Sequence, residues 1–328
     1  MTAGQLDARG AVQRLARSTR ALIVGHQRPD GDSLGSQLAL AELAAALGVP
    51  AVVVNRDPAP ATLDELPGRD RVAVGNSLPE GFPQAFDLVV AVECPEPDRA
   101  GFPGLDRLPI LNIDHHPANP LYGEVNYVDA DAPATGELVW RMFRAAGVKP
   151  SAAAATNAYV ALSTDTGDFR YSNATGRAFR AAAEMVDAGA DPTLVAGWIH
   201  GRRKAAAVLL LGEALSTLRL EAEGRIAVIE LDVAAFRRAG AAPEDTEDII
   251  NHPRAIDGVR AVVFLKQWEQ AAVRVSLRSA GAVDVRRIAE RFGGGGHANA
   301  AGCTLDGDLP SAREAVLAAV RETLEAAL

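Results

Sequence analysis

Residues 21–33 read Ala-Leu-Ile-Val-Gly-His-Gln-Arg-Pro-Asp-Gly-Asp-Ser, and a long Ala- and Leu-rich segment, 36–47, follows them. An apolar tetrapeptide, a turn containing proline and glycine, and a second apolar segment predict a strand, a tight turn and a helix. Open α/β sheets bind their ligands at such turns. The side chains of His26, Asp30 and Asp32 form a ligand set suited to manganese, zinc or iron. The alternative is a polar turn in which Ser33 or Asp32 caps the following helix.

Apolar segments alternate with helical patterns along the first two thirds of the chain. Strands are predicted over 21–25, 51–54, 72–74, 87–92 and 110–113. Helices are predicted over 6–17, 36–47, 135–146, 152–163, 175–188 and 192–199. This alternation predicts an α/β fold, a mainly parallel sheet with flanking helices, over about residues 1–200.

The pattern changes after a Leu-rich segment, 201–219, which we interpret as a connecting helix or linker. Strands are predicted over 226–231, 261–266 and 272–279, and helices over 285–292 and 312–327. Residues 220–328 are therefore expected to form a smaller α+β domain. We expect the active-site cleft to lie between this domain and the first.

Composition limits the classes of function. The chain has 328 residues, 48% hydrophobic and 23% charged, with a net charge of −9. An acidic protein is a poor match for long nucleic acid, so any nucleic-acid substrate is expected to be short. Two distant cysteines, Cys94 and Cys303, exclude a disulfide framework. Neither a signal peptide nor a membrane span is visible, so we expect a cytoplasmic protein, and a homodimer as the commonest oligomer.

Ligand-type residues recur where the predicted elements end. Glu93 follows the strand 87–92, Asp114-His115-His116 follows the strand 110–113, and Asp165 follows a helix. Each residue alone has an ordinary explanation as a solvated strand end or a turn cap. Because parallel strands bring their carboxyl ends to one edge of a sheet, we expect these side chains to converge.

The combined motifs resemble the DHH phosphoesterase family with its carboxyl-terminal DHHA1 domain. The resemblance rests on four motifs in the order of the family: His26-x-x-x-Asp30-x-Asp32, Asp114-His115-His116, Thr164-Asp165-Thr166-Gly167 and Gly293-Gly-Gly-Gly-His297. It covers nearly the whole chain. Within the family the chain is similar to the stand-alone nanoRNase and pAp-phosphatase subgroup.

The resemblance implies a site for two metal ions, usually Mn²⁺, that activate a hydroxide for attack on phosphorus. The implied ligands are His26 and Asp30 for the first metal, Asp32, His115 and Asp165 for the second, and Glu93 as the bridge. Glu93 departs from the family, in which Asp is usual at this position. We expect metal binding to be retained with an altered spacing or preference, and the alternative is a degraded site.

Two further residues of the first domain are expected to act in catalysis. By resemblance, Asp114 would orient a ligand histidine through its ring N–H. His116 would face the substrate phosphate as a hydrogen-bond donor or as a general acid to the leaving oxygen.

The second domain is expected to bind the substrate. A glycine-rich loop before His297 would bring backbone N–H groups close to an anion, and its alternative is a flexible connection. Arg278 matches the strand-end arginine of the family and is a candidate phosphate clamp. The expected contacts are Arg278, Ser279, Gly295, Gly296 and His297.

The function implied by the resemblance is hydrolysis of short oligoribonucleotides to mononucleotides, of 3′-phosphoadenosine 5′-phosphate to AMP, or of both. One alternative is a phosphodiesterase for cyclic dinucleotides or for linear products such as pApA. Another alternative, of a different class, is a nucleotide-binding sensor with an impaired site, which the glutamate at position 93 keeps open.

Overall fold

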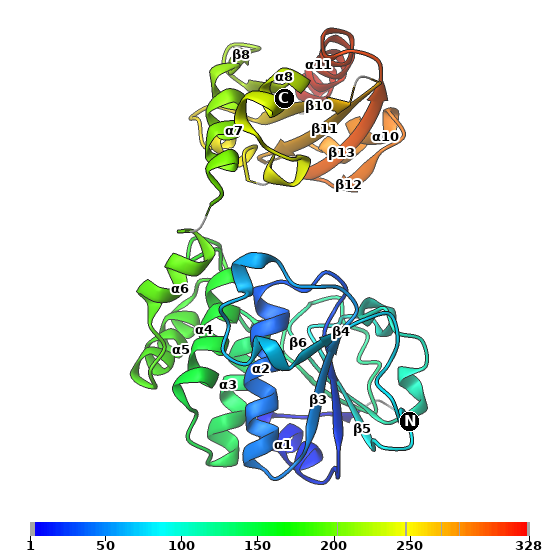
Figure 1. Cartoon of the computed structure of the whole chain (residues 1–328), viewed down its shortest axis with the longest axis vertical. Coiled ribbons are helices and arrows are strands. Elements are labelled where there is room, and N and C mark those ends of the chain that lie inside the picture. The colour runs from blue at the N-terminus through cyan, green and yellow to red at the C-terminus, as the bar shows by residue number, and fades with distance from the viewer. Residues whose placement is uncertain (1–3, 202, 247, 270, 282, 327–328) are drawn as a thin grey trace. The chain divides into compact units, whose positions relative to one another are not determined.

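The computed structural model describes residues 4–201, 203–246, 248–269, 271–281 and 283–326. The chain forms two compact units that divide between residues 202 and 203 (Figure 1). No helix in these ranges is long and apolar enough to cross a membrane. The cleft expected between the two domains stays a prediction.

A seven-stranded sheet organises the first unit. Its order is β1-β7-β6-β5-β2-β3-β4, and neighbouring strands pair in parallel. The strands are β1 (Gly4–Gln5), β2 (Ala21–Val24), β3 (Ala51–Asn55), β4 (Val72–Val74), β5 (Leu88–Val92), β6 (Ile110–Asp114) and β7 (Val125–Val128). This arrangement confirms the predicted parallel α/β fold. The strands β1 and β7 were not predicted; both are short and lie at one edge of the sheet.

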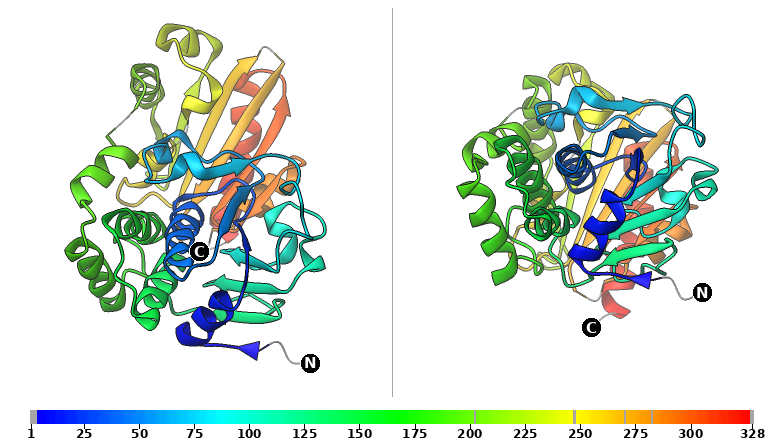
Figure 2. Two further views of the ribbon diagram at one scale, coloured as in Figure 1. Left: turned by 60° about the horizontal axis from the view of Figure 1, so that its bottom comes forward. Right: turned by 90° about the horizontal axis from the view of Figure 1, so that it is seen from below.

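Helices cover one face of this sheet and gather on one side in Figures 1 and 2. They are α1 (Ala8–Ala16), α2 (Gly31–Ala46), α3 (Thr135–Ala146), α4 (Ala152–Asp165), α5 (Gly176–Asp187) and α6 (Pro192–Ile199). Alternate strand residues divide between the two faces: Ile23 and Val90 pack under the helices, whereas Leu22 and Val89 pack under loops. Short 3₁₀ turns lie within the loops, at Ala61–Leu63, Arg69–Arg71, Pro97–Ala100 and Leu105–Arg107.

The start of α2 differs from the prediction. The helix begins at Gly31, five residues before the predicted 36, and Asp30 is its N-cap residue. Asp30 adopts an extended backbone and its Oδ1 accepts a hydrogen bond from the Ser33 backbone N–H at 3.0 Å. Asp32 therefore lies in the first turn of the helix rather than in a loop. The alternative prediction, that Ser33 or Asp32 caps the helix, was wrong, because the capping residue is Asp30.

The second unit contains a six-stranded mixed sheet of order β12-β13-β11-β10-β9-β8. Its strands are β8 (Arg219–Glu221), β9 (Ile226–Leu231), β10 (Ala261–Glu269), β11 (Ala272–Ser279), β12 (Gly295–His297) and β13 (Ala300–Asp306). Only β9 and β10, among the described pairs, run parallel. This sheet confirms the expected smaller α+β fold.

Helices pack against both faces of the second sheet. They are α7 (Ala205–Ser216), α8 (Val233–Ala239), α9 (Asn251–Arg254), α10 (Val285–Arg291) and α11 (Leu309–Ala326), with a 3₁₀ turn at Pro243–Thr246. The helices α10 and α11 cover one face, and α7, α8 and α9 cover the β9 and β10 part of the other. The helix predicted as a connector thus packs, as α7, within the second unit.

Candidate active site

The candidate site lies where the strand order of the first sheet reverses. The chain runs from β2 outward to β3 and β4, then returns to β5 on the other side of β2 and continues outward through β6. His26 follows β2, Glu93 follows β5 and Asp114 ends β6, so all three lie at the carboxyl edge of the sheet. Open α/β sheets form ligand sites at this switch point because the connections diverge there and leave room.

A first group combines His26, Asp30 and Glu93, whose ligand-type atoms lie within 4.8 Å of one another. His26 Nε2 lies 3.1 Å from Glu93 Oε2 and 3.6 Å from Asp30 Oδ1. The other ring nitrogen, Nδ1, lies 2.7 Å from the Gln27 carbonyl oxygen, to which it can donate. That bond leaves Nε2 facing the two carboxylates, in the form in which histidine binds metals.

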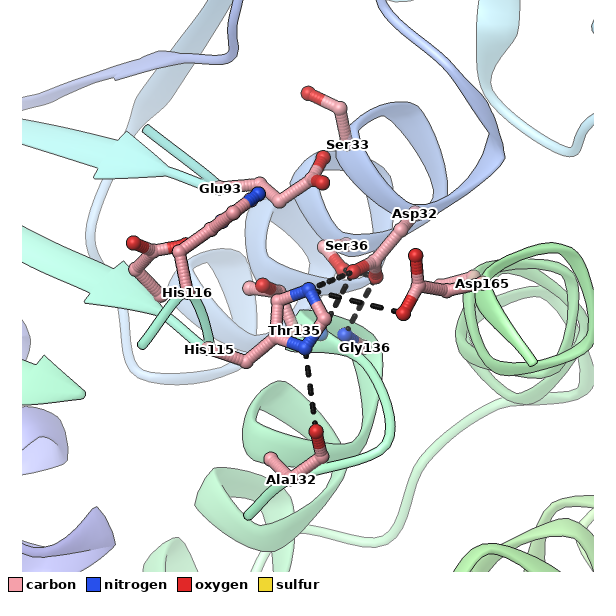
Figure 3. A network of polar contacts seen from close by, with 12 residues as sticks. Asp32, Ser33, Ser36, Glu93, His115, His116, Ala132, Thr135, Gly136 and Asp165 are labelled. Atoms are coloured by element: carbon pink, nitrogen blue, oxygen red, sulfur yellow. Dashed lines mark hydrogen bonds and ion pairs between the residues drawn. The ribbon is translucent and has the colours of Figure 1, made fainter. Parts of the chain in front are cut away.

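A second group, within the same 4.8 Å limit, combines Asp32, His115 and Asp165 (Figure 3). His115 Nε2 lies 3.7 Å from Asp32 Oδ2 and 3.7 Å from Asp165 Oδ2. His115 Nδ1 lies 3.2 Å from the Ala132 carbonyl oxygen, so the backbone orients this ring. The structure therefore brings together Asp32 from the first turn of α2, His115 from the loop after β6 and Asp165 from the end of α4.

The carboxylate of Asp32 is held by the amino terminus of α3. It accepts hydrogen bonds from the backbone N–H groups of Thr135 at 2.7 Å and Gly136 at 2.9 Å, and from Ser36 Oγ at 3.0 Å. A Cβ at Gly136 would lie 2.4 Å from the Ala161 Cβ, so glycine permits this close approach of helices. The sequence analysis missed these donors, although glycine in the first turn of a predicted helix was a visible signal.

Glu93 lies between the two groups. Its side chain is buried. One of its carboxylate oxygens also lies within 4.8 Å of a ring nitrogen of His115 and of a ring nitrogen of His116. Glu93 Oε2 has no aligned hydrogen-bond donor, although it is fully enclosed. The backbone of Glu93 is left-handed, at φ 55°, while its N–H bonds to the Ile113 carbonyl at 2.9 Å. A strained residue is thus fixed at the strand end, as is common at functional sites.

Several carboxylate groups lie close together in these two groups. Burial, together with the charges of Asp165 and Asp30, raises the pKa of Asp32 to about 7. Burial and the Asp32 charge raise the pKa of Glu93 well above its usual range. Although burial opposes the charged imidazole, Asp30 and Glu93 raise the pKa of His26 to about 10. Excess negative charge, and a carboxylate oxygen of Glu93 without an aligned donor, fit divalent cations that prefer oxygen and imidazole ligands.

His116 and Asp114 form a separate pair beside these groups. Asp114 Oδ1 lies 2.8 Å from His116 Nδ1, and this hydrogen bond raises the pKa of His116. We expected Asp114 to orient a histidine that binds metal. The histidine that Asp114 contacts is His116, and the orienting role of Asp114 stays a prediction. The carboxylate also accepts a 2.6 Å hydrogen bond from Asn119 Nδ2, a residue that the sequence analysis missed.

In the second unit, Arg278 and Ser279 are consecutive strand residues with different environments. Arg278 is partly exposed, and its Nη1 donates a hydrogen bond to the Leu277 carbonyl at 3.0 Å. Ser279 is buried: its Oγ donates to the Val283 carbonyl at 2.6 Å and accepts from Asn299 Nδ2 at 2.9 Å. The Ser279 hydroxyl thus fixes the loop after β11, and its substrate contact stays a prediction.

The glycine-rich segment is not the loop that the sequence predicted. Gly295, Gly296 and His297 form the edge strand β12, paired with β13. A Cβ at Gly296 would lie 2.5 Å from the Ala300 carbonyl oxygen, and the φ of Gly296 is 142°. The close approach of two strands therefore accounts for this glycine, without an anion. His297 is exposed on β12, and the substrate contacts of all three residues stay predictions.

Comparison with known proteins identifies the family. The family model described as "DHH family, N-terminal domain" matches residues 20–163, and the "DHHA1 domain" matches residues 224–326. The chain is 36% identical over 304 residues to the "Bifunctional oligoribonuclease and PAP phosphatase NrnA" of Thermus thermophilus, covering 92% of this chain and 89% of that protein. It is 26% identical to the Bacillus subtilis protein of the same name, over 85% of this chain and 87% of that one.

One solved structure has the same fold. It is an exopolyphosphatase-related protein from Bacteroides fragilis, with a TM-score of 0.79 and 22% identity, covering 95% of this chain and 96% of that chain. The two family models, the identity to the Thermus thermophilus protein and the ligand groups at the sheet edge lead to one conclusion. The chain belongs to the DHH family of phosphoesterases and carries the DHHA1 domain of that family in its second unit.

Proposed function

We propose that this chain hydrolyses short oligoribonucleotides to mononucleotides and 3′-phosphoadenosine 5′-phosphate to AMP, with two Mn²⁺ ions per chain. The observation that carries the proposal is the two ligand groups beside the His116–Asp114 pair, with Glu93 of the first group also within 4.8 Å of His115 of the second. The choice of substrates is supported by the name of the Thermus thermophilus relative, an oligoribonuclease and PAP phosphatase, which matches 92% of this chain.

The metal ligands that we propose are the residues of the two groups. His26 and Asp30 would hold one ion, Asp32, His115 and Asp165 would hold the other, and Glu93 would bridge them. Bound divalent cations would supply positive charge for the phosphate and would lower the pKa of an attacking water. Before any ion binds, the Asp32 carboxylate is already fixed by three donors, which limits the rearrangement that binding requires.

His116 and Asp114 would move the proton that the leaving group needs. The 2.8 Å bond from His116 Nδ1 to Asp114 stabilises the imidazolium and keeps the proton on Nε2 available for the leaving oxygen. Asp114 is fully buried, and although burial opposes its charge, its bonds to His116 and Asn119 lower its pKa. It therefore remains a carboxylate that orients His116 throughout the reaction.

A panel assay on the full-length protein tests the proposal. The substrates are 3′-phosphoadenosine 5′-phosphate, RNAs of two to five nucleotides, pApA, cyclic di-AMP and a long single-stranded DNA, each with Mn²⁺ and with a chelator. We expect release of mononucleotide from the short RNAs and of AMP from the bisphosphate, abolished by the chelator. The Mn²⁺ content of the protein, measured by mass spectrometry, should approach two ions per chain and fall in His115→Ala.

Other results would replace the proposal. Turnover confined to cyclic di-AMP or pApA would make the chain a dinucleotide phosphodiesterase. Bound metal without turnover of any substrate would favour a nucleotide-binding sensor, with Glu93 as the residue responsible. Efficient digestion of the long DNA would contradict the preference for short substrates.

A further inference from the structure

One short segment contacts two of the three ligand side chains in the second group. Residues 132–136 lead into α3 and face Asp32 and His115 (Figure 3). The Ala132 carbonyl oxygen lies 3.2 Å from His115 Nδ1, and two backbone N–H groups at the other end of the segment donate to Asp32. The third ligand side chain, Asp165, ends α4 and has, among the described residues, no hydrogen bond of its own to this segment.

Asn173 connects Asp165 to the segment. Its Nδ2 donates to the Pro133 carbonyl oxygen at 3.0 Å, to the Asp165 carbonyl oxygen at 3.1 Å and to Asp165 Oδ2 at 3.3 Å. Because an amide nitrogen carries two N–H groups, at least one of them is shared between two of these acceptors. One side chain therefore ties Asp165, at both its backbone and its carboxylate, to the segment that holds the other two ligand side chains.

The orientation of the Asn173 amide follows from its surroundings. The reverse orientation would place Oδ1 against three oxygen acceptors, which would repel it. In the observed orientation Oδ1 is enclosed and has no hydrogen-bond partner. An enclosed oxygen without a donor costs stability, so its presence calls for an explanation beyond packing. The three contacts of Nδ2 provide that explanation.

The loop from Asp165 to Asn173 has a strained backbone. Residues 167–169 are left-handed, with φ of 56°, 55° and 61°, and two of them are not glycine. The Tyr171 backbone N–H donates to the Thr166 carbonyl oxygen at 3.0 Å and closes the turn. Such strain persists where the surrounding structure imposes the conformation, and it concentrates at functional sites. Here the turn brings Asn173 back beside Asp165, eight residues earlier in the chain.

Asp165 depends on this amide more than Asp32 depends on any single donor. Asp32 accepts three hydrogen bonds and is 1% exposed. Within the residues that the structure describes, Asn173 is the only hydrogen-bond donor to the Asp165 carboxylate, and that side chain is 27% exposed. Its histidine neighbour, His115, lies 3.7 Å away. Without Asn173 the carboxylate would be free to rotate toward solvent.

We propose that Asn173 is a positioning residue, which holds Asp165 in place beside Asp32 and His115 and thereby sets the affinity of the second group for its divalent cation. The inference rests on the proposed function, since that proposal makes Asp165 a metal ligand. Asn173 acts through Asp165 and is not itself a ligand, because its Nδ2 faces Asp165 and its oxygen is enclosed. Replacing residues that orient metal ligands typically weakens metal binding by about 10- to 100-fold.

The test is a titration of the metal-free, full-length protein with Mn²⁺, in which electron paramagnetic resonance measures the free ion. It compares the wild type, Asn173→Ala, Asp165→Ala and the double variant. We expect Asn173→Ala to weaken the binding of one of the two Mn²⁺ ions by about 10- to 100-fold and to change the other by less than about twofold. In the Asp165→Ala background, Asn173→Ala should change Mn²⁺ binding by less than about twofold, because the two residues act as one unit.

Asn157→Ala is the matched control. Asn157 also donates through Nδ2 to a proline carbonyl, that of Pro67 at 3.0 Å, and its Oδ1 is also enclosed without a partner. It lies outside both ligand groups, so we expect Asn157→Ala to leave Mn²⁺ binding unchanged within about twofold. The Tm of the metal-free chain should fall no more in Asn173→Ala than in Asn157→Ala, which separates positioning from a general loss of stability.

Unchanged Mn²⁺ affinity in Asn173→Ala, equal weakening of both ions, or a further loss in the Asp165→Ala background would overturn the inference. Mn²⁺ binding without turnover of any substrate would contradict the proposed function alone, because the titration contains no substrate. A wild-type chain that binds no Mn²⁺ would overturn both. If Asn173→Ala does not fold, Asn173→Ser, whose shorter side chain cannot span the same three acceptors, takes its place with the same expected loss.

Discussion

The two units contain charge clusters of opposite sign. In the first, Asp32, Glu93 and Asp165 converge at the carboxyl edge of a parallel sheet, with too few cations to balance them. In the second, Lys266 and Arg278 share a sheet face with no carboxylate in ion-pair contact among the described residues. Each cluster is costly alone and fits a ligand of the other sign: metal cations for the first unit and a phosphate for the second.

The clusters also differ in how they are built. Asp32 is 1% exposed and is held by three donors, and Asp114 is fully buried against Asn119. Lys266 and Arg278 stand on a strand face and have few contacts that fix them. We infer that the first cluster is preorganised for chemistry, whereas the second is adapted to binding. Changes in the first should therefore lower kcat, and changes in the second should raise KM.

The largest effect is expected for His115→Ala. Removing this ring leaves Asp32 and Asp165 without the imidazole that faces both carboxylates. We expect kcat/KM to fall by about 10³-fold or more, since metal-assisted charge stabilisation supplies several kcal/mol. The Mn²⁺ content and the rise in Tm on adding Mn²⁺ should fall as well. Full activity of His115→Ala would show that His115 is not part of the site. His252→Ala, at a histidine outside both clusters, is the matched control.

His116→Gln should reduce kcat by about 10²- to 10³-fold, because it removes the proposed proton donor. It should leave the Mn²⁺ content unchanged, since we assign His116 to proton transfer. Steady-state kinetics with short RNA measure kcat, and metal analysis of the same sample measures the Mn²⁺ content. Loss of metal would show that His116, whose ring lies near Glu93, is a ligand instead.

Glu93→Asp should have a smaller effect. The shorter side chain restores the residue usual in the family but withdraws the carboxylate from His26, which lies 3.1 Å away. We expect activity within about tenfold of the wild type and a changed ratio of Mn²⁺ to Zn²⁺ activity, because metal–oxygen distances tolerate little slack. The assay compares both metals in both proteins. Activity present only in the Asp variant would favour the sensor interpretation.

The smallest effect is a pH dependence in the second cluster. The pKa of Lys266 is lowered to about 8, so its charge is present below that pH and lost above it. KM for pApA should therefore rise about fivefold between pH 7 and 9.5 in the wild type and stay flat in Lys266→Arg. Parallel curves for the two proteins would contradict this assignment.

Several parts of the molecule were predictable because local sequence determines them. The apolar strands β2, β5 and β6 and the helix α3 lie within a few residues of the predicted ranges, since burial and helical periodicity are visible in the chain. The metal-type residues were visible because each directly follows such an element. Their assignment to two metals stays a proposal, while their proximity is an observation.

Other features depended on contacts between distant segments. The prediction of a loop at Gly295–His297 was wrong because β12 exists only through its pairing with β13. The histidine that contacts Asp114 could not be predicted, since the local sequence does not distinguish His115 from His116 as its partner. The two backbone donors to Asp32 come from α3, which starts 103 residues later in the chain.

The fold class, the family and the residue types at the strand ends follow from the amino-acid sequence, because periodicity and motif order are properties of the chain. The tertiary structure alone decided which atoms meet. It placed Glu93 between the two groups, fixed Asp32 on the amino terminus of α3 and set Lys266 beside Ser276. The physical reason is that side-chain partners across a sheet or between helices depend on strand order, register and helix packing, which local sequence does not specify.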